Sequence, residues 1–398
     1  MDRRNFLDAS LRPPAHDHQP PDEAGAPASC AVLDIRAYIA HRRNATTAYG
    51  RIINGHEIQV TFCVAPPPVT SYFCVWCPEP QNLTKLATEP RIIAAEADLV
   101  VLSVRLGSGF PMKAPWLRRL SREDNSYFGY FNLGLLRLVD DDDHYYVVSL
   151  SRTRVPWQFD LHIFDSKTET WSCRIASLGR QHQHSQFEHS ATKVIMLGGG
   201  GLMGFVDPWR GILVCNVLDD DPMLHYMSFP RSLRDNKKLD LNPAVARDVV
   251  AVDGRIKVVE CFCDAVSSSW KVSIWSRPST SWEENWNRDC KLDICDNLVD
   301  NGTFNFELLS ELQGNDDGTP LQRKRTLEWL QISHPRLSLN DDDVVYLMAK
   351  VQPRDKKACV LAVDFKNKRL QDVAVFLADR SRCDTMCYMN SSITKYFC

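Results

Sequence analysis

The sequence lacks the features that direct a protein into a membrane or through the secretory pathway. Its 398 residues contain no apolar run of the roughly 18 residues needed to cross a bilayer. Residues 1–28 carry charges and prolines but no apolar core, which excludes a secretory signal, and their acidic residues argue against a transit peptide. We therefore expect a cytoplasmic or nuclear protein without a membrane partner, whose cysteines are free thiols.

An excess of charge of one sign is also missing. The net charge is −3, and no basic field argues for nucleic acid as a partner. The 14 cysteines fall below the density of small disulfide-stapled domains. No serine-hydrolase elbow, phosphate-binding loop, zinc-protease or kinase motif occurs, so the sequence names no catalytic residue.

What the chain does contain, from about Cys30, is a succession of short apolar runs bounded by Gly, Pro, Asn or Asp. This pattern predicts β-strands and tight turns. Asn54-Gly55 and Asp253-Gly254 are each suited to a two-residue hairpin turn that needs positive φ. After the first of these, Ile58, Val60 and Phe62 alternate with polar residues, the period of a half-buried strand.

Hairpins of similar form recur at 159–171, 270–282 and 359–373, which predicts an all-β, β-propeller-like fold. Blades of about 40–50 residues allow six or seven in the strand-rich region, and a helical insertion near 297–333 favours about six. A β-sandwich or paired barrels is the alternative. The predicted organisation is a disordered tail at 1–28, one domain at 29–378, and a C-terminal tail or closing strand at 379–398.

A glycine-rich stretch, "VIMLGGGGLMGFVDPWRGILV", resembles a dinucleotide-binding fingerprint through Gly199, Gly201 and Gly204. Such a site requires a helix directly after the glycines, and Pro208 and Gly211 interrupt the chain where that helix would form. The stretch instead predicts strand, turn, strand, turn, strand. The glycines then serve close backbone packing, or less favourably a ring of backbone that contacts a ligand.

Two further groups could carry metal or redox chemistry. Cys74 and Cys77 form a C-x-x-C on a predicted strand, where residues three apart face opposite sides, so structural thiols are favoured. His182, His184 and His189 lie in a polar stretch typical of a solvated loop. The sequence therefore predicts no metal and no cofactor.

Longer stretches of the chain are more distinctive, among them "KVIMLGGGGLMGFVDPWRGILVCNVL" and "LSLNDDDVVYLMAKV". From about Val32 to Phe376 the sequence resembles the plant protein family called domain of unknown function 1618, which is expanded in grasses. The resemblance implies a plant origin and a propeller-like fold akin to F-box-associated domains, but no established activity. No F-box is apparent ahead of Cys30. The chain departs from the family at 130–133, where a longer connection is usual, so one blade is expected to be incomplete.

These observations favour a non-enzymatic propeller that binds a protein or peptide through its loops. Trp209 and Arg210 are the candidate interaction residues, although a tryptophan that packs in the turn is the simpler explanation for the former. One alternative is a propeller hydrolase or lyase that uses His182, His184 and Asp207. The other is a carbohydrate- or metabolite-binding module, for which a channel lined by tryptophans would speak.

Overall fold

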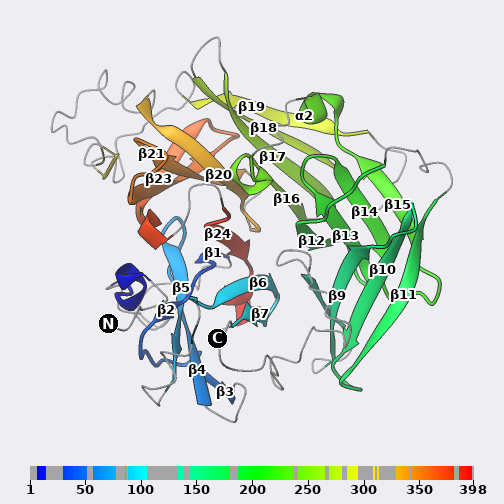
Figure 1. Cartoon of the computed structure of the whole chain (residues 1–398). Helices are drawn as coiled ribbons and strands as arrows, with labels where there is room; N and C mark the ends of the chain where they lie inside the picture. Colours follow the sequence, from blue (N-terminus) through cyan, green and yellow to red (C-terminus); the bar gives the residue numbers. More distant parts are fainter. Residues whose placement is uncertain are drawn as a thin grey trace.

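The fold is that of a computed structural model of the whole chain (Figure 1). The structure describes residues 7–14, 30–51, 57–77, 86, 88–104, 133–138, 144–179, 187–235, 241–264, 269–279, 285–294, 308–309, 312, 329–340, 343–380 and 385–396. β-Strand is the main regular secondary structure of these residues, as predicted, and their helices are short.

The strands form successive units along the chain, mostly antiparallel, with parallel pairing of β5 to both β1 and β2 in the first unit and of β11 to β15 between the third and fourth. The first unit contains β1 (Ala31–Asp34), β2 (Tyr38–Ile39), β3 (Ala48–Arg51), β4 (Glu57–Cys63), β5 (Thr70–Trp76) and the C-terminal β24 (Tyr388–Ser391). The second contains β6 (Arg91–Glu96) and β7 (Leu99–Ser103). The third contains β8 (Leu133–Arg137), β9 (Tyr145–Arg152), β10 (Gln158–Asp165) and β11 (Thr170–Leu178).

Three further units of four strands follow. The fourth contains β12 (Lys193–Met196), β13 (Leu202–Asp207), β14 (Gly211–Asn216) and β15 (Met223–Ser228), and it joins the third through β11 and β15 into one eight-stranded sheet. The fifth contains β16 (Arg247–Val252), β17 (Arg255–Asp264), β18 (Ser269–Pro278) and β19 (Asn287–Asp293). The sixth contains β20 (Gln331–Leu337), β21 (Val344–Lys350), β22 (Lys357–Asp364) and β23 (Arg369–Leu377).

The leading strands of these units contact one another in a ring. Strand β6 contacts β8, β8 contacts β12, β12 contacts β16, β16 contacts β20, and β20 contacts β24. Figure 1 shows β12, β16, β20 and β24 toward the middle of the molecule, with the later strands of the fourth and fifth units farther out. This is the arrangement of a β-propeller with six units, in agreement with the fold predicted from the repeated hairpins.

The two ends of the chain close the ring. Strand β24 pairs antiparallel with β1 over four residues, from Ala31 opposite Ser391 to Asp34 opposite Tyr388. Directly after β1, the backbone carbonyl of Ile35 accepts a hydrogen bond of 2.9 Å from the N–H of Ile92. The C-terminal strand β24 thus lies beside β1 at the point where the ring closes. Because the closing contacts join residues far apart in sequence, no local stretch of the chain could form them alone.

Hairpins account for most of the connections, as the turn residues predict. Asp253 and Gly254 have φ values of 49° and 69°, the conformation that a tight turn between β16 and β17 requires. Strands β10 and β11, and likewise β22 and β23, are joined directly as hairpins. The turn at Asn54-Gly55 lies outside the described residues, but the strands that flank it, β3 and β4, are paired.

The alternation predicted for β4 was wrong in one respect. Gln59 and Thr61 were expected to face solvent, yet they are 1% and 0% exposed, while Val60 and Phe62 are half-buried. The side chains of both polar residues donate hydrogen bonds to the carbonyl oxygen of Arg42. Both faces of the sheet are therefore covered, and the polar residues are satisfied by the neighbouring backbone rather than by water.

The apolar core lies between adjacent sheets. One cluster joins the fifth and sixth units and includes Val259, Ile274, Leu347 and Leu361. Another joins the fourth and fifth and includes Val214, Phe229 and Val258. Such face-to-face contacts hold neighbouring units at a fixed angle, which positions the side chains that point into the middle of the ring.

Part of the segment 1–28, predicted to be a disordered tail, is packed against the domain. Residues Asp8–Leu11 form a short 3-10 helix, η1, in which Ser10 is buried and donates a hydrogen bond of 2.8 Å to Glu89. Most of the predicted helical insertion at 297–333 lies outside the described residues, although Leu308, Leu309 and Leu312 are helical. The connection at 130–132, and with it the expected incomplete blade, also lies outside them.

Candidate functional site

The glycine-rich stretch forms the turn between β12 and β13. Gly200 and Gly201 have φ values of 75° and 93°, a conformation that L side chains rarely adopt. A Cβ at Gly201 would lie 2.6 Å from the side-chain oxygen of Asn216. No helix follows: β13 starts at Leu202 and leads through a second turn into β14. The succession of strand, turn, strand, turn, strand is as predicted. Close packing accounts for Gly201 and Gly204, but at Gly198, Gly199 and Gly200 an added Cβ would meet no atom within 4 Å.

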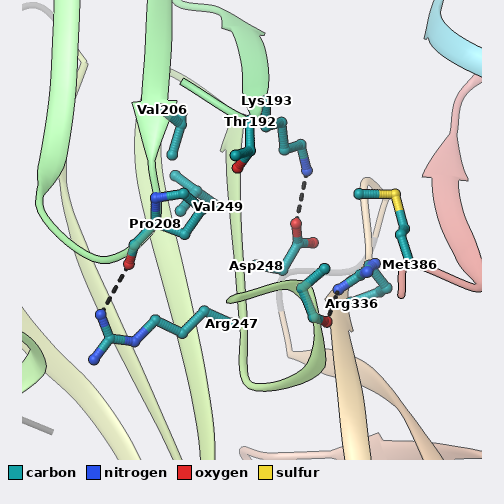
Figure 2. Close-up of a pocket in the computed structure, with 10 residues that line it drawn as sticks. Thr192, Lys193, Val206, Pro208, Arg247, Asp248, Val249, Arg336 and Met386 are labelled. Atoms are coloured by element: carbon teal, nitrogen blue, oxygen red, sulfur yellow. Dashed lines mark hydrogen bonds and ion pairs between the residues drawn. The ribbon is translucent and has the colours of Figure 1, made fainter. Parts of the chain in front are cut away.

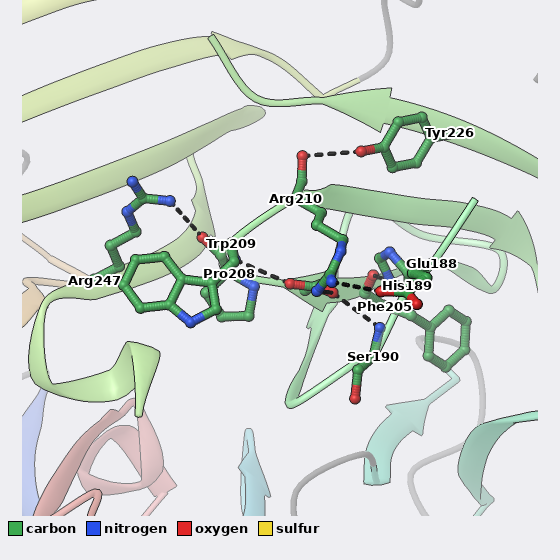
Figure 3. Close-up of polar contacts among 10 residues, drawn as sticks. Glu188, His189, Ser190, Phe205, Pro208, Trp209, Arg210, Tyr226 and Arg247 are labelled. Atoms are coloured by element: carbon green, nitrogen blue, oxygen red, sulfur yellow. Dashed lines mark hydrogen bonds and ion pairs between the residues drawn. The ribbon is translucent and has the colours of Figure 1, made fainter. Parts of the chain in front are cut away.

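The second turn is organised by Asp207, which is 2% exposed. One carboxylate oxygen accepts a hydrogen bond of 3.0 Å from the backbone N–H of Trp209. The other accepts from the backbone N–H of Ser190 at 2.9 Å and from the guanidinium of Arg210 at 3.1 Å (Figure 3). With its oxygens engaged by three donors, this carboxylate holds the turn and is not free to act as an acid or base.

Trp209 is buried, at 7% exposure, and packs inside the protein. The guanidinium carbon of Arg247 lies 4.6 Å from the centre of its ring, and Arg247 also donates a hydrogen bond of 2.8 Å to the carbonyl of Pro208 (Figure 3). Arg247 is itself paired with buried Glu260 at 3.0 Å. Trp209 therefore has the turn-packing role, and its indole is not available as a surface anchor.

Arg210 is the member of the candidate pair that reaches the surface. Its side chain is 29% exposed and bridges two carboxylates, with Glu188 at 2.8 Å and Asp207 at 3.1 Å. Its carbonyl accepts a hydrogen bond of 2.9 Å from the hydroxyl of Tyr226. These contacts fix the guanidinium in place and neutralise it, so it offers little unmatched charge to a partner.

A different set of residues surrounds a hollow at the middle of the ring (Figure 2). The empty space is about 300 Å³, including the open mouth. Side chains from the leading strands of the fourth, fifth and sixth units meet there with Met386, which lies two residues before β24. We call this the central hollow; its lining consists of Thr192, Lys193, Val206, Pro208, Ala244, Arg247, Asp248, Val249, Arg336 and Met386.

Two of the charged groups in the central hollow neutralise each other. The ammonium group of Lys193 lies 2.7 Å from a carboxylate oxygen of Asp248, whose side chain is only 4% exposed (Figure 2). The other oxygen of Asp248 accepts a backbone hydrogen bond of 3.4 Å from Leu337. Arg247 is likewise neutralised by Glu260. These pairs leave Arg336 as the positive group without a described carboxylate partner.

Arg336 is 2% exposed and is held by the backbone. Its Nε donates to the carbonyl of Tyr388 at 3.1 Å, and its Nη1 donates to the carbonyls of Ala244 at 3.2 Å and Pro335 at 2.6 Å. Its Nη2 is buried and has no hydrogen-bond partner within the described part of the chain. Burying a charged donor without an acceptor costs free energy. Of the groups that line the hollow, this atom therefore gains most from a hydrogen bond to a ligand.

His334 lies beside Arg336 at a β-bulge in β20, with a positive φ of 52°. Its Nε2 is 2.8 Å from the carbonyl of Thr385, 3.6 Å from the thiol of Cys387, and its Nδ1 is 2.9 Å from the hydroxyl of Ser333. A carbonyl can only accept, so Nε2 carries the proton and Nδ1 accepts from Ser333. Nε2 therefore cannot remove the thiol proton, which argues against a Cys–His nucleophile.

Burial and the neighbouring Arg336 lower the pKa of His334 to about 3. Burial likewise lowers the pKa of His189 to about 4, and this ring hydrogen-bonds the carbonyl of Phe205 at 2.9 Å. Both imidazoles are thus neutral near physiological pH and serve packing.

The other residues singled out from the sequence do not converge on a site. His182 and His184 lie outside the described residues. Cys74 and Cys77 are buried, and a hydrogen bond with the thiol of Cys63, together with burial, raises the pKa of Cys74. Across the described residues, no three His, Cys, Asp or Glu side chains are grouped to hold a metal ion.

No motif in the sequence indicated the central hollow. Lys193, Asp248 and Arg336 lie in strands of ordinary composition, in three different units. One signal that could have indicated the hollow is a charged residue in an otherwise apolar strand such as "RDVVAV", because a charged side chain that faces the interior is unusual.

Residues 205–346 match the family model described as protein of unknown function (DUF1618). No curated protein matches the sequence. No helix in the described part of the chain is long and apolar enough to span a bilayer.

Solved structures with a similar arrangement include a GH43 endo-arabinanase from Bacillus licheniformis, with 11% identity, a TM-score of 0.28, and coverage of 86% of this chain and 96% of that one. An α-L-arabinanase from Penicillium chrysogenum has 10% identity, a TM-score of 0.26, and coverage of 88% and 98%. The β-propeller domain of Cps50 (Swd1) from Myceliophteria thermophila has 7% identity, a TM-score of 0.23, and coverage of 63% and 88%. Likeness at this level says nothing about activity or substrate.

Proposed function

We propose that this protein is a non-enzymatic binding propeller of the cytoplasm or nucleus, which holds a protein or peptide partner over the central hollow. The observation that carries the proposal is the buried Nη2 of Arg336, a donor for which the described part of the chain provides no acceptor, where three units meet. A rigid ring suits this role, because it fixes donors from distant parts of the chain around one point.

The hydrolase alternative has less support. Hydrolysis of a glycosidic bond ordinarily uses two carboxyl groups, one on each side of the scissile bond. Among the lining residues of the hollow there is one carboxylate, Asp248, and it is engaged by Lys193 and by the backbone of Leu337. Asp207, the carboxylate suggested from the sequence, is occupied by the turn that it organises.

The carbohydrate- or metabolite-binding alternative also lacks its expected feature. Sugar-binding sites commonly place an aromatic ring against the sugar face, and several tryptophans around the channel would favour such a site. The residues that line the hollow include valine, proline, alanine and methionine but no aromatic side chain. The charged and aliphatic lining instead suits a protein side chain with an apolar stem and a charged end.

Peptide selection against the intact protein tests the proposal. Peptides from a displayed random library are selected on the wild-type chain and then measured on two variants, Thr192→Trp, which fills the hollow, and Thr168→Trp, which adds the same ring on the exposed turn between β10 and β11. We expect the selected peptides to lose binding to T192W and keep it to T168W, at unchanged circular dichroism. Failure to enrich any peptide, or equal binding to both variants, would contradict the proposal.

A further inference from the structure

We infer that the central hollow is a carboxylate-binding site, and that the group it takes from a partner is an acidic side chain or a chain-terminal carboxylate. The inference rests on the proposed function and adds the chemistry of the ligand. Arg336 is the centre of this site, because its buried Nη2 has no hydrogen-bond acceptor among the described residues.

The geometry of Arg336 prepares it to receive an oxygen. Three backbone carbonyls hold its Nε and Nη1, so the guanidinium plane is fixed before a ligand arrives. A fixed donor loses little conformational entropy on binding, and a hydrogen bond from a guanidinium to a carboxylate is stronger than one between neutral groups. An incoming carboxylate oxygen would both satisfy the buried donor and neutralise the charge.

The charge balance of the hollow favours an anion with one negative charge. Among the described residues that line the hollow, Lys193 is paired with Asp248 and Arg247 with Glu260, whereas Arg336 has no carboxylate of its own. A carboxylate matches it. A phosphate group carries about −1.5 to −2 at neutral pH, and the surplus would be repelled by Asp248 at the same site.

The apolar part of the lining suits the stem of an acidic side chain. Val206, Val249 and Met386 line the hollow together with the charged groups. The hollow is open to solvent at its mouth, so the end of a partner's side chain or chain can approach Arg336 while the rest of the partner remains outside.

A carboxylate supplied by the protein itself gives the first test. Met386 lines the hollow and is half-buried, and glutamate and glutamine differ there only in the charge and the donor of their end group. We expect Met386→Glu to melt about 2–4 °C above Met386→Gln, because the tethered carboxylate satisfies Arg336. A glutamate variant that melts at or below the glutamine variant would overturn the inference.

Free anions give the second test. Sodium acetate, at the same ionic strength as a chloride control, should raise the melting temperature of the wild-type chain and of M386Q. The rise should be lost in M386E, whose own carboxylate fills the site, and reduced in Arg336→Lys, which lacks the fork of donors. A rise that is equal in all four proteins is non-specific and would refute the site, and a larger rise with inorganic phosphate than with acetate would refute the choice of carboxylate.

The outcomes separate this inference from the proposed function. In a control, every Glu and Asp of the selected peptides is changed to its amide and the C-terminus is amidated. If these peptides still need an open hollow and bind equally well, the peptide-binding function stands and the carboxylate site is refuted. A clear acetate effect without any selectable peptide would support the anion site and refute the peptide-binding function.

Discussion

Protonation of His334 should make the protein markedly less stable in mild acid. The imidazole is 1% exposed, and its pKa falls from an ordinary value of 6.5 to about 3 in the folded chain, because burial and Arg336 disfavour the charged ring. Between these two values the unfolded chain binds a proton that the folded chain does not. Stability therefore rises with pH across this window and is lost as the pH falls below 6.5.

The size of the effect follows from the two pKa values. Going from about pH 7 to about pH 4.5, this one imidazole should lower the free energy of unfolding by about 2.5 kcal/mol, because each pKa unit corresponds to about 1.4 kcal/mol. The variant His334→Asn removes the titrating group while keeping a residue that tolerates the positive φ of 52°. Carboxylates such as Asp165 and Asp364 have lowered pKa values in the folded chain. Their protonation also destabilises the protein in acid, but by the same amount in the wild type and in H334N.

Urea unfolding followed by tryptophan fluorescence measures the difference. The wild-type chain and H334N are each unfolded at both pH values. The decrease in the free energy of unfolding of H334N between the two pH values is subtracted from that of the wild type. A difference of about 2–3 kcal/mol is expected. His189→Asn provides a second comparison at a distant site, with a similar expectation from its pKa of about 4. If H334N loses as much stability as the wild type, the imidazole is not held neutral by its surroundings.

Three further predictions concern the turn and its buried support. Gly211→Ala should cost about 1–3 kcal/mol in chemical unfolding, because the added Cβ would lie 2.3 Å from the carbonyl oxygen of Met227; an unchanged midpoint would show that the strands can separate there. Arg247→Met should cost about 3–5 kcal/mol by removing one partner of a buried ion pair, and the loss should shrink when Glu260→Gln is added in a double-mutant cycle. Glu188→Gln should cost less than about 1 kcal/mol, because its ion pair with Arg210 is largely exposed, whereas Arg210→Ala should cost about 1–3 kcal/mol by removing a donor from the buried carboxylate of Asp207; equal thermal shifts in the two variants would contradict this.

Local features of the fold could be predicted because local residues cause them. Asp253-Gly254 forces a tight turn by its φ preferences, wherever the flanking strands lie. Pro208 and Gly211 prevent a helix after the glycine-rich turn, which is sufficient to exclude the arrangement of a dinucleotide site. Each of these conclusions depends on a few consecutive residues, and the structure agrees with each of them.

Predictions that depended on which face is buried were less secure. The polar alternation of β4 suggested a solvent-facing side, but the neighbouring segments cover Gln59 and Thr61. Trp209 could be a surface anchor or a packing residue from its sequence alone. Its burial against Arg247 was decided by a strand about 40 residues farther along the chain, which no local pattern specifies.

The sequence by itself therefore determined the class of the fold, the strand and turn pattern, and the failure of the glycine-rich stretch to form a phosphate cradle. Only the tertiary structure decided that Lys193, Asp248 and Arg336 share one hollow. These residues lie in separate units, and they meet because the leading strands contact one another in a ring that β1 and β24 close. Ring closure is a long-range event, so the missing hydrogen bond of Arg336, and the ligand chemistry inferred from it, become apparent only once the ring has formed.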